Sequence, residues 1–386
     1  MTGGDNSGDG DDRLAEHIVA ALAPCQYEGL ISRHTVDAIC RSDCGALPAA
    51  ITSLFGFECQ LGQEKPAADF LVRIGAEPGE WSALDVAGRD DAVWRGVATL
   101  LRTRARPRSP LAALLKNIWL EYDFIDPADP ATTLNVFFGT DKIARGADTK
   151  WAMDLAAMLR GERLSAACRQ AMKRLVAALP QAARVFQIGV MCARPRTPLR
   201  VCVIGPELDE VCSFLSAARW SGALPRVVDT LNHFAPVIDH VALDLDILDD
   251  GRIGTKLGIE LYQAPGADIG PQFVELISRL AAGKFCVPQK ATGLLAWGGI
   301  THERRHRNLW PAALMVRRAL RGGGESSTFC RWLHHIKIVI DGHAPPAAKA
   351  YLAVGHVFLA DSAIRDLLRR TTEETGAHQL VRHMQS

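Results

Sequence analysis

The sequence lacks the motifs and hydrophobic runs that define several large classes of protein. No apolar run approaches the ~18 to 20 residues of a membrane-spanning helix, and the run at 351–360 is broken by Gly355 and His356. Neither G-x-G-x-x-G nor G-x-x-x-x-G-K-[ST] occurs, which excludes the Rossmann and P-loop nucleotide sites. No serine or cysteine stands in a recognisable nucleophile elbow. The sequence therefore predicts neither an integral membrane protein nor one of these enzymes.

An excess of charge of either sign is missing as well. Lys plus Arg number 44, Asp plus Glu number 43, and the formal net charge is +1. No basic stripe follows the chain, which argues against nucleic acid as a partner. The ten cysteines are scattered, and Cys40 and Cys44 form neither a C-x-x-C pair nor half of a zinc site. We expect buried thiols in a cytoplasmic protein.

The N-terminus has no basic start and no apolar core, so it does not resemble a signal peptide. Residues 1–12 are rich in Gly and Asp and are predicted to be a disordered tail. No linker rich in Pro, Gly or Ser divides the remainder. Residues 13–386 are therefore predicted to form a single domain.

A supersecondary unit of helix followed by hairpin recurs about five times along the chain. Turn residues such as Pro66, Pro127, Pro195, Gly251 and Pro345 separate the two strands of each pair. The predicted strand pairs are 57–62 with 68–75, 118–125 with 133–139, 184–191 with 199–205, 240–247 with 255–262, and 335–341 with 348–355. Helices are predicted over 32–55, 90–116, 148–180, 207–237 and 269–333, and from about 360.

The strands alternate between an apolar and a polar face. In 240–247 the residues Val241 and Leu243 share one face, while Asp244 and Asp246 share the other. Because the connecting helices must bury an apolar stripe, they should cover the apolar strand faces and leave the polar faces around a wet lumen. This predicts an α+β fold, a closed ten-stranded antiparallel barrel with helices outside. An open antiparallel sheet with one face in solvent is the alternative.

Five helix-wrapped hairpins around such a barrel resemble the ABBA or PT-barrel group of aromatic prenyltransferases. The stretch FECQLG, a loop and ADFLVRIGAEPG resembles the first hairpin of the indole prenyltransferases. The resemblance implies that Glu58 acts as a base and that Arg73, shortly before Glu77-Pro78, binds diphosphate. Inner hairpins of the group carry basic-x-Tyr motifs, which here are reduced to Asn135-x-Phe137 and Arg200-x-Cys202, with only Lys349-x-Tyr351 retained.

The implied activity is transfer of a prenyl group from an allylic diphosphate to an aromatic or nitrogen-rich acceptor, such as an amino acid, a peptide or a small natural product. Such a reaction needs cations around the leaving group, aromatic faces around the allyl cation and a carboxylate for the acceptor. Glu58 is the expected catalytic residue. Diphosphate binding and shielding are expected from Arg73, Arg200, Lys256, Lys337, Lys349, Tyr262 and Tyr351. Acceptor binding is expected from Glu121, Asp123, Asp244, Asp246 and Glu260.

The extra carboxylates leave alternatives open. They could bind a cationic acceptor, recruit a divalent metal such as Mg²⁺ to carry the diphosphate, or only neutralise the lumenal Lys and Arg. The protein could also be a non-catalytic barrel that binds a peptide or small molecule. A third reading takes His302-Glu303-x-x-His306 as the H-E-x-x-H motif of a zinc hydrolase. Its two arginines and the nearby Pro311 instead favour a basic surface loop.

Overall fold

The computed structural model describes most of the 386-residue chain. The described residues are 12–23, 25, 27, 29–75, 92–106, 108–123, 133–192, 194, 199–263, 271–322, 324–342 and 344–365. Residues 1–11, and Glu77-Pro78 of the predicted first hairpin, lie outside them. Asp12, placed in the predicted tail, is described, and its carboxylate lies 3.0 Å from His17 Nε2. The division into a tail and one domain stays a prediction.

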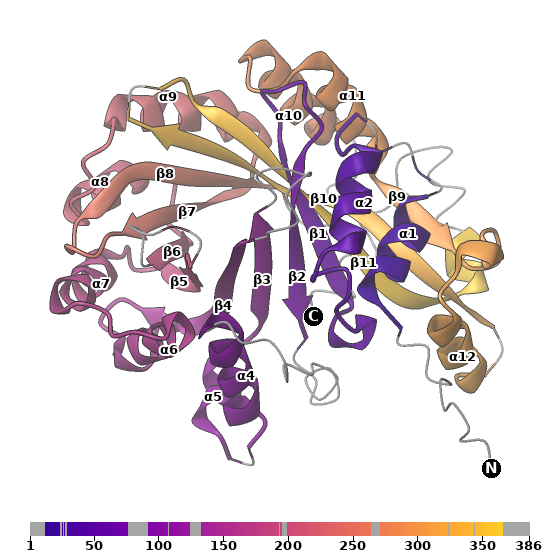
Figure 1. Ribbon diagram of the computed structural model, residues 1–386. Coiled ribbons are helices and arrows are strands. Elements are labelled where there is room, and N and C mark those ends of the chain that lie inside the picture. The colour runs from indigo at the N-terminus through magenta and orange to yellow at the C-terminus, as the bar shows by residue number, and fades with distance from the viewer. Residues whose placement is uncertain are drawn as a thin grey trace.

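Ten strands form a closed antiparallel barrel. They are β1 (Leu54–Gln60), β2 (Ala68–Ile74), β3 (Ile118–Asp123), β4 (Thr133–Ala144), β5 (Arg184–Val190), β6 (Leu199–Ile204), β7 (His240–Ile247), β8 (Ile253–Tyr262), β10 (Glu325–Asp341) and β11 (Ala347–Ala360). Strands β1 to β8 pair in chain order, β8 pairs with β10, and β10 pairs with β11. The barrel closes where β11 pairs with β1, with Glu58 opposite Tyr351 (Figure 1). The predicted barrel is confirmed, and the open sheet is wrong.

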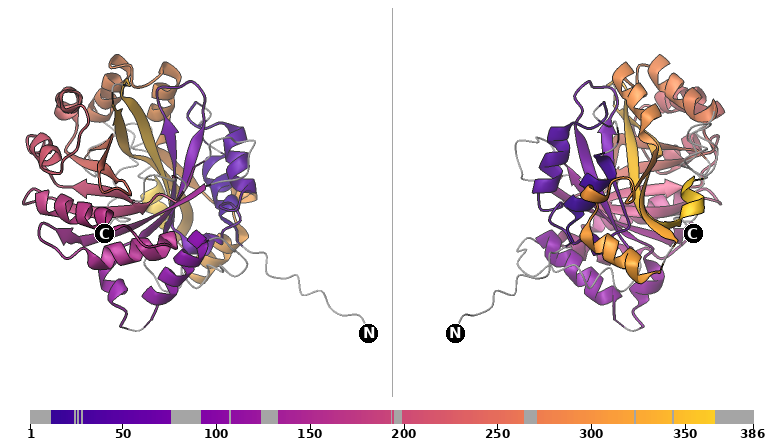
Figure 2. Two further views of the ribbon diagram at one scale, coloured as in Figure 1. Left: turned by 60° about the vertical axis from the view of Figure 1, so that its left-hand side comes forward. Right: turned by 90° about the vertical axis from the view of Figure 1, so that its right-hand side faces the viewer.

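Helices surround the strands on the outside (Figure 2). They are α1 (Leu14–Leu22), α2 (Arg33–Arg41), α4 (Ala92–Arg104), α5 (Pro110–Leu114), α6 (Lys150–Arg160), α7 (Ala166–Ala178), α8 (Val211–Ala217), α9 (Leu224–Phe234), α10 (Pro271–Ala282), α11 (Pro288–Trp297) and α12 (Ala312–Leu320). Three 3₁₀ turns are η1 (Ala49–Ile51), η2 (Ala235–Val237) and η3 (Arg307–Leu309). No helix in the described ranges is long and apolar enough to cross a membrane. The ten cysteines are free thiols, buried or half-buried.

The hydrophobic core fills the layer between the helices and the outer face of the barrel. On β7 the side chains of Val241, Leu243 and Leu245 are fully buried in this core. Asp244 and Asp246 alternate with them and line cavities inside the barrel. The polar faces of the strands therefore turn inward because the apolar faces pack under helices, as the alternation predicts.

Two of the predicted helical blocks are partly wrong. The block 269–333 contains β9 (Gly299–His302) and the first part of β10, which pair with each other in register Cys330↔Ile300. Pairing with β9 and β11 satisfies this part of β10 as a strand, although its sequence shows no clear alternation. The block 32–55 ends as a helix at Arg41. The chain then turns back on the end of the helix, where a Cβ at Gly45 would lie 2.4 Å from the carbonyl oxygen of Cys40, so only glycine fits. Pro48 opposes a longer helix.

Residues 361–365 are helical, as predicted from about 360, and residues 366–386 lie outside the described residues.

Candidate active site

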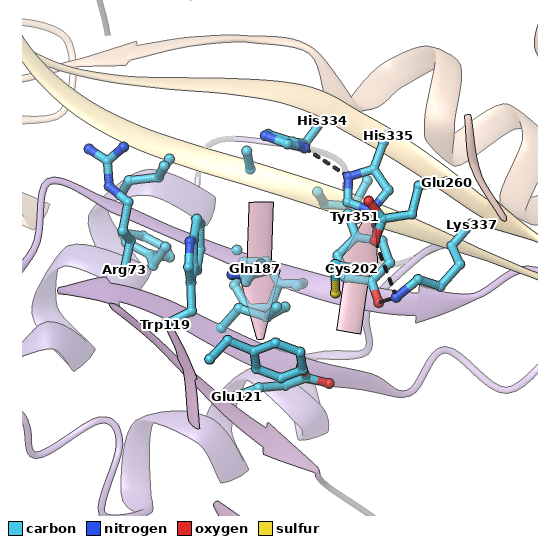
Figure 3. Close-up of a pocket in the computed structure, with 18 of the residues that line it drawn as sticks. Arg73, Trp119, Glu121, Gln187, Cys202, Glu260, His334, His335, Lys337 and Tyr351 are labelled. Atoms are coloured by element: carbon cyan, nitrogen blue, oxygen red, sulfur yellow. Dashed lines mark hydrogen bonds and ion pairs between the residues drawn. The ribbon is translucent and has the colours of Figure 1, made fainter. Parts of the chain in front are cut away.

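The barrel lumen holds a main cavity of about 250 Å³ and a smaller one of about 20 Å³. Asp244 and Lys337 are walls of both. Arg73 and Trp119 lie on one side of the main cavity, and Lys337, Glu260 and Tyr351 lie on the opposite side (Figure 3). Glu121 lies across from His334 and His335 (Figure 3). The lumen is therefore polar and charged at one side and largely aromatic at the other.

Glu58 is a buried carboxylate bound by two side chains of β11. It is held in short contacts by the ammonium of Lys349 and the hydroxyl of Tyr351, both on the neighbouring strand β11. Burial alone would raise its pKa, but the charges of Lys349 and Lys337 and the two hydrogen bonds outweigh burial and hold the pKa of Glu58 well below its usual range. A carboxylate with so low a pKa is a weak proton acceptor at neutral pH.

Lys337 connects Glu58 to the acidic strands β7 and β8. Its Nζ donates to the hydroxyl of Tyr351 at 2.7 Å and lies 2.6 Å from Asp244 Oδ2 and 3.5 Å from Glu260 Oε1. The same ammonium lies 4.7 Å from the centre of the Tyr351 ring. Burial opposes its charge, but the nearby carboxylates of Asp244, Glu260 and Glu58 raise its pKa, so Lys337 stays charged.

Aromatic side chains surround Glu260 near its contact with Lys337. Tyr262 donates its hydroxyl hydrogen to Glu260 Oε2 at 2.6 Å. The ring of His335 stacks on Tyr351 with centroids 4.1 Å apart, and its Nδ1 lies 2.8 Å from Nδ1 of His334. Burial lowers the pKa of both histidines. Both rings are therefore neutral at physiological pH and can exchange hydrogen bonds with an uncharged ligand.

Asp246 and Asp123, two further carboxylates predicted to line the lumen, also have partners. Arg200 donates to Asp246 through Nε at 2.9 Å and Nη2 at 3.1 Å, a bidentate pair in the buried lumen. Asp123 Oδ2 lies 3.6 Å from Arg194 Nη2 and accepts from Asn135 Nδ2 at 3.2 Å. No group of three His, Cys, Asp or Glu among the described residues could bind a metal ion. Asp246 and Asp123 therefore neutralise neighbouring cations in the lumen.

Lys256 is the exception among the lumenal cations. It borders the small cavity with Arg194, Arg200 and Lys349, and within the described part of the chain its ammonium forms no ion pair. Burial, followed by the charges of Lys349, Arg200 and Arg194, lowers its pKa. An anion bound there would reverse these repulsions, so this end of the lumen is a favourable place for one.

Glu121 is the exception among the lumenal carboxylates. It is buried on β3, lines the main cavity and has no hydrogen-bond or ion-pair partner among the described side chains. Burial and the charges of Glu58 and Asp123 raise its pKa to about 7, against smaller opposing effects of Lys337 and Arg200. Of Glu58 and Glu121, Glu121 is the one whose pKa lies near neutral pH.

Of the apolar side of the cavity, the sequence predicted only Phe137. This side is formed by Leu54, Leu71, Trp119, Phe137, Phe186 and Trp332. A register shift between Val185 and Gln187 lets neighbouring residues Phe186 and Gln187 both line the cavity. A second shift between Leu333 and His335 does the same for His334 and His335. Strict alternation cannot anticipate such irregularities, although the adjacent histidines were a visible sign.

Phe137 is positioned by a missing side chain on the next strand. Gly189 pairs with Phe137, and a Cβ at Gly189 would lie 2.3 Å from the ring. We expect Gly189→Ala to push the ring into the cavity and to destabilise the fold by about 1–3 kcal/mol. Urea denaturation would measure this, and adding Phe137→Leu should recover at least half of the loss. No recovery would show that Gly189 is needed for its backbone and not for the space it leaves.

The structure brings most of the predicted site residues together, with one division. Arg200, Lys256, Lys337, Lys349, Asp244 and Asp246 surround the small cavity. Glu121, Glu260, Tyr262 and Tyr351 line the main one, and Glu58 bonds to Tyr351 at its edge. Arg73 also lines the main cavity, but on the aromatic side and apart from the other predicted diphosphate ligands (Figure 3).

The H-E-x-x-H segment does not form the helix that a zinc motif requires. His302 ends β9, residues 303–305 form a turn, and Glu303 Oε1 lies 2.7 Å from Arg318 Nε in an ion pair. Two histidines bind zinc in this motif only when they lie one turn apart on a helix. The segment is the surface loop that its arginines favoured.

The sequence matches no protein-family model and no curated protein. Similar solved structures include 5-dimethylallyltryptophan synthase from Streptomyces coelicolor, with 14% identity, 89% of this chain and 98% of that chain covered, and a TM-score of 0.46. Its complex with DMASPP and Trp has 13% identity, with 88% of this chain and 92% of that chain covered, and a TM-score of 0.43. The apo form of the prenyltransferase PriB has 12% identity, with 89% of this chain and 93% of that chain covered, and a TM-score of 0.39. The closed barrel is established by the strand pairing of this chain itself.

Proposed function

We propose that the protein transfers a prenyl group from an allylic diphosphate to an aromatic or nitrogen-rich acceptor bound in the lumen. The observation that carries this proposal is that two unlike cavities lie next to each other and share Asp244 and Lys337 as walls. The small one has the unpaired Lys256 among Arg194, Arg200 and Lys349, and the main one is aromatic and contains Glu121. An allylic diphosphate has the same division, with an anionic head and an apolar chain.

In this proposal the diphosphate binds at the cationic end. Arg200, Lys256, Lys337 and Lys349 would stabilise the negative charge that grows as the C1–O bond breaks. The small cavity has room for about one water molecule. The partly exposed side chain of Lys256 would therefore move outward to make room for the diphosphate and would remain in contact with it. Asp244, Asp246 and Glu260 would orient these cations. A Mg²⁺ ion, if used, would arrive bound to the diphosphate, since Asp244 and Asp246 at this end are paired with Lys337 and Arg200.

The allyl cation would form beside the shared wall of the two cavities. The faces of Tyr351 and Tyr262 can stabilise it and exclude water. Glu58, whose pKa is held low by Lys349 and Lys337, would hold Lys349 and Tyr351 in place and add negative charge near the cation. Arg73, on the aromatic side, would face the acceptor and not the diphosphate. Asp123, paired with Arg194, would act at the margin of the site.

Mass spectrometry of products tests the proposal directly. The protein would be incubated with dimethylallyl, geranyl and farnesyl diphosphate, with and without Mg²⁺, and a panel of tryptophan, tyrosine, histidine, arginine and short peptides. We expect a product heavier by one prenyl unit, and at least a tenfold higher KM for the donor in Lys256→Met, about 1.4 kcal/mol of binding. Lys150→Met, on an exposed helix surface, is the control. An unchanged donor KM in Lys256→Met would refute the assignment of the diphosphate end.

A non-catalytic binding barrel is the second candidate. It is favoured by the pairing of Arg200, Lys337 and Lys349 with carboxylates, because a diphosphate must compete with these internal anions. Absence of product with every donor, together with no thermal shift on adding a non-cleavable diphosphate analogue, would favour it.

A further inference from the structure

We propose that Glu121, and not Glu58, is the general base that accepts the proton from the acceptor in this reaction. The inference rests on the proposed function and specifies its substrate class: the acceptor presents a neutral N–H or O–H on an aromatic ring to the wall formed by β3 and β4. It differs from the role that sequence resemblance implies for Glu58.

The first step of the argument is which carboxylate is available. Both oxygens of Glu58 are engaged, one by Lys349 and the other by Tyr351. Asp244, Asp246 and Glu260 are engaged by Lys337, Arg200 and Tyr262. Among the described carboxylates that line the main cavity, Glu121 alone has both oxygens free to accept a hydrogen bond from a ligand.

The second step is position. Along β3, Trp119 and Glu121 point to the same side, and their partners on β4 are Phe137 and Asn135. An aromatic acceptor that packs against Trp119 and Phe137 would place a polar ring hydrogen within reach of Glu121. The opposite wall, with His334 and His335, lies across the cavity from Glu121 (Figure 3). The acceptor would therefore be held between the two walls.

The third step is proton affinity. Burial, then Glu58 and Asp123, raise the pKa of Glu121 to about 7, against Lys337 and Arg200, whereas the pKa of Glu58 is held low. A base with a pKa near the working pH is the most effective one. The other titratable groups that line the same cavity are Arg73 on β2, Cys202 on β6, Asp244 on β7, Glu260 and Tyr262 on β8, His334, His335 and Lys337 on β10 and Tyr351 on β11.

The proposed step balances. The C1–O bond of the donor breaks and its electron pair leaves with the diphosphate. The nucleophilic atom of the acceptor forms a bond to C1, and its hydrogen passes as a proton to an oxygen of Glu121. Glu121 then returns the proton to water when the product leaves.

The test compares pH profiles of kcat/KM for wild type, Glu121→Gln, Glu58→Gln and the control Glu275→Gln, which alters an exposed ion pair on α10. Wild type and control should lose activity as the pH falls below about 7, because the base becomes protonated. Glu121→Gln should be about 100-fold slower and lack this limb. Glu58→Gln, whatever its rate, should keep the limb and shift it to lower pH, because the charge of Glu58 raises the pKa of Glu121.

An infrared measurement supports the assignment without turnover. The carbonyl stretch of a protonated carboxyl group should disappear between about pH 5.5 and 8.5 in wild type and be missing from Glu121→Gln. Glu121→Gln with wild-type rate and an unchanged limb would overturn the inference while the transferase stands. No product from wild type with any donor would overturn the proposed function, and the inference with it.

Discussion

Replacing Lys337 by methionine is expected to destabilise the fold by about 3–5 kcal/mol, a large fraction of a typical domain's stability. The ammonium of Lys337 lies 2.6 Å from Asp244, and the two side chains are 8% and 4% exposed. Methionine has a similar shape but would leave Asp244 and Glu260 as buried anions near Glu58. The destabilisation comes from these uncompensated charges and not from lost packing. Urea denaturation at neutral pH measures it.

Two variants separate this effect from a general intolerance of change. In Lys150→Met, the broken pair with Asp154 is 76% and 45% exposed, and the expected change is below about 1 kcal/mol. Adding Asp244→Asn to Lys337→Met should restore at least half of the lost stability, because it removes one of the unpaired anions. If the double variant were less stable than Lys337→Met alone, the charge explanation would be wrong.

Glu121→Gln is expected to stabilise the folded protein at alkaline pH and to have little effect near pH 4. The pKa of Glu121 is raised from 4.5 to about 7 in the folded state, mainly by burial. Between these values the folded state binds more protons than the unfolded state, so its stability falls as the pH rises. Above about pH 7 the full penalty applies, on the order of 3 kcal/mol from the size of the shift. Glutamine cannot ionise and avoids it.

Thermal or urea unfolding of wild type and variant at several pH values checks this prediction without any substrate. The difference in unfolding free energy should grow from near zero at about pH 4 to about 1–3 kcal/mol at pH 8. Glu275→Gln, at an exposed position, should show no such growth. A constant difference across the pH range would mean that Glu121 does not titrate near neutrality. A residue that destabilises the fold yet is kept in the cavity is typical of a functional site.

The charge pattern of the lumen has a further meaning for the proposed reaction. Fixed pairs such as Arg200 with Asp246 hold their charges in place before any ligand binds. Groups that are already oriented need little rearrangement when charge develops in a transition state. In the proposed reaction, Lys256 and Glu121, which have no ion-pair partner among the described residues, would mark the two places that the donor and the acceptor complete.

The sequence by itself determined the barrel and most of its inward residues. The period of two in strands such as 240–247 separates Val241 and Leu243 from Asp244 and Asp246, and helices between hairpins require a covered apolar face. Those two local facts favour a closed barrel with a polar lumen over an open sheet, and Glu58, Glu121 and the lumenal lysines follow from the same rule. Local patterns hold this information because each strand must bury one face.

Only the tertiary structure decided which charges meet. Glu58 lies on the first strand of the barrel and Lys349 on the last. Their pairing depends on the register with which these two strands close the barrel. The register shifts that bring Phe186 and His334 to the cavity are likewise invisible in the alternation. Charge interactions depend on distances across the lumen, and sequence periodicity gives the face of a residue but not its partner. That is why the exceptional states of Lys256 and Glu121 appear only in the folded molecule.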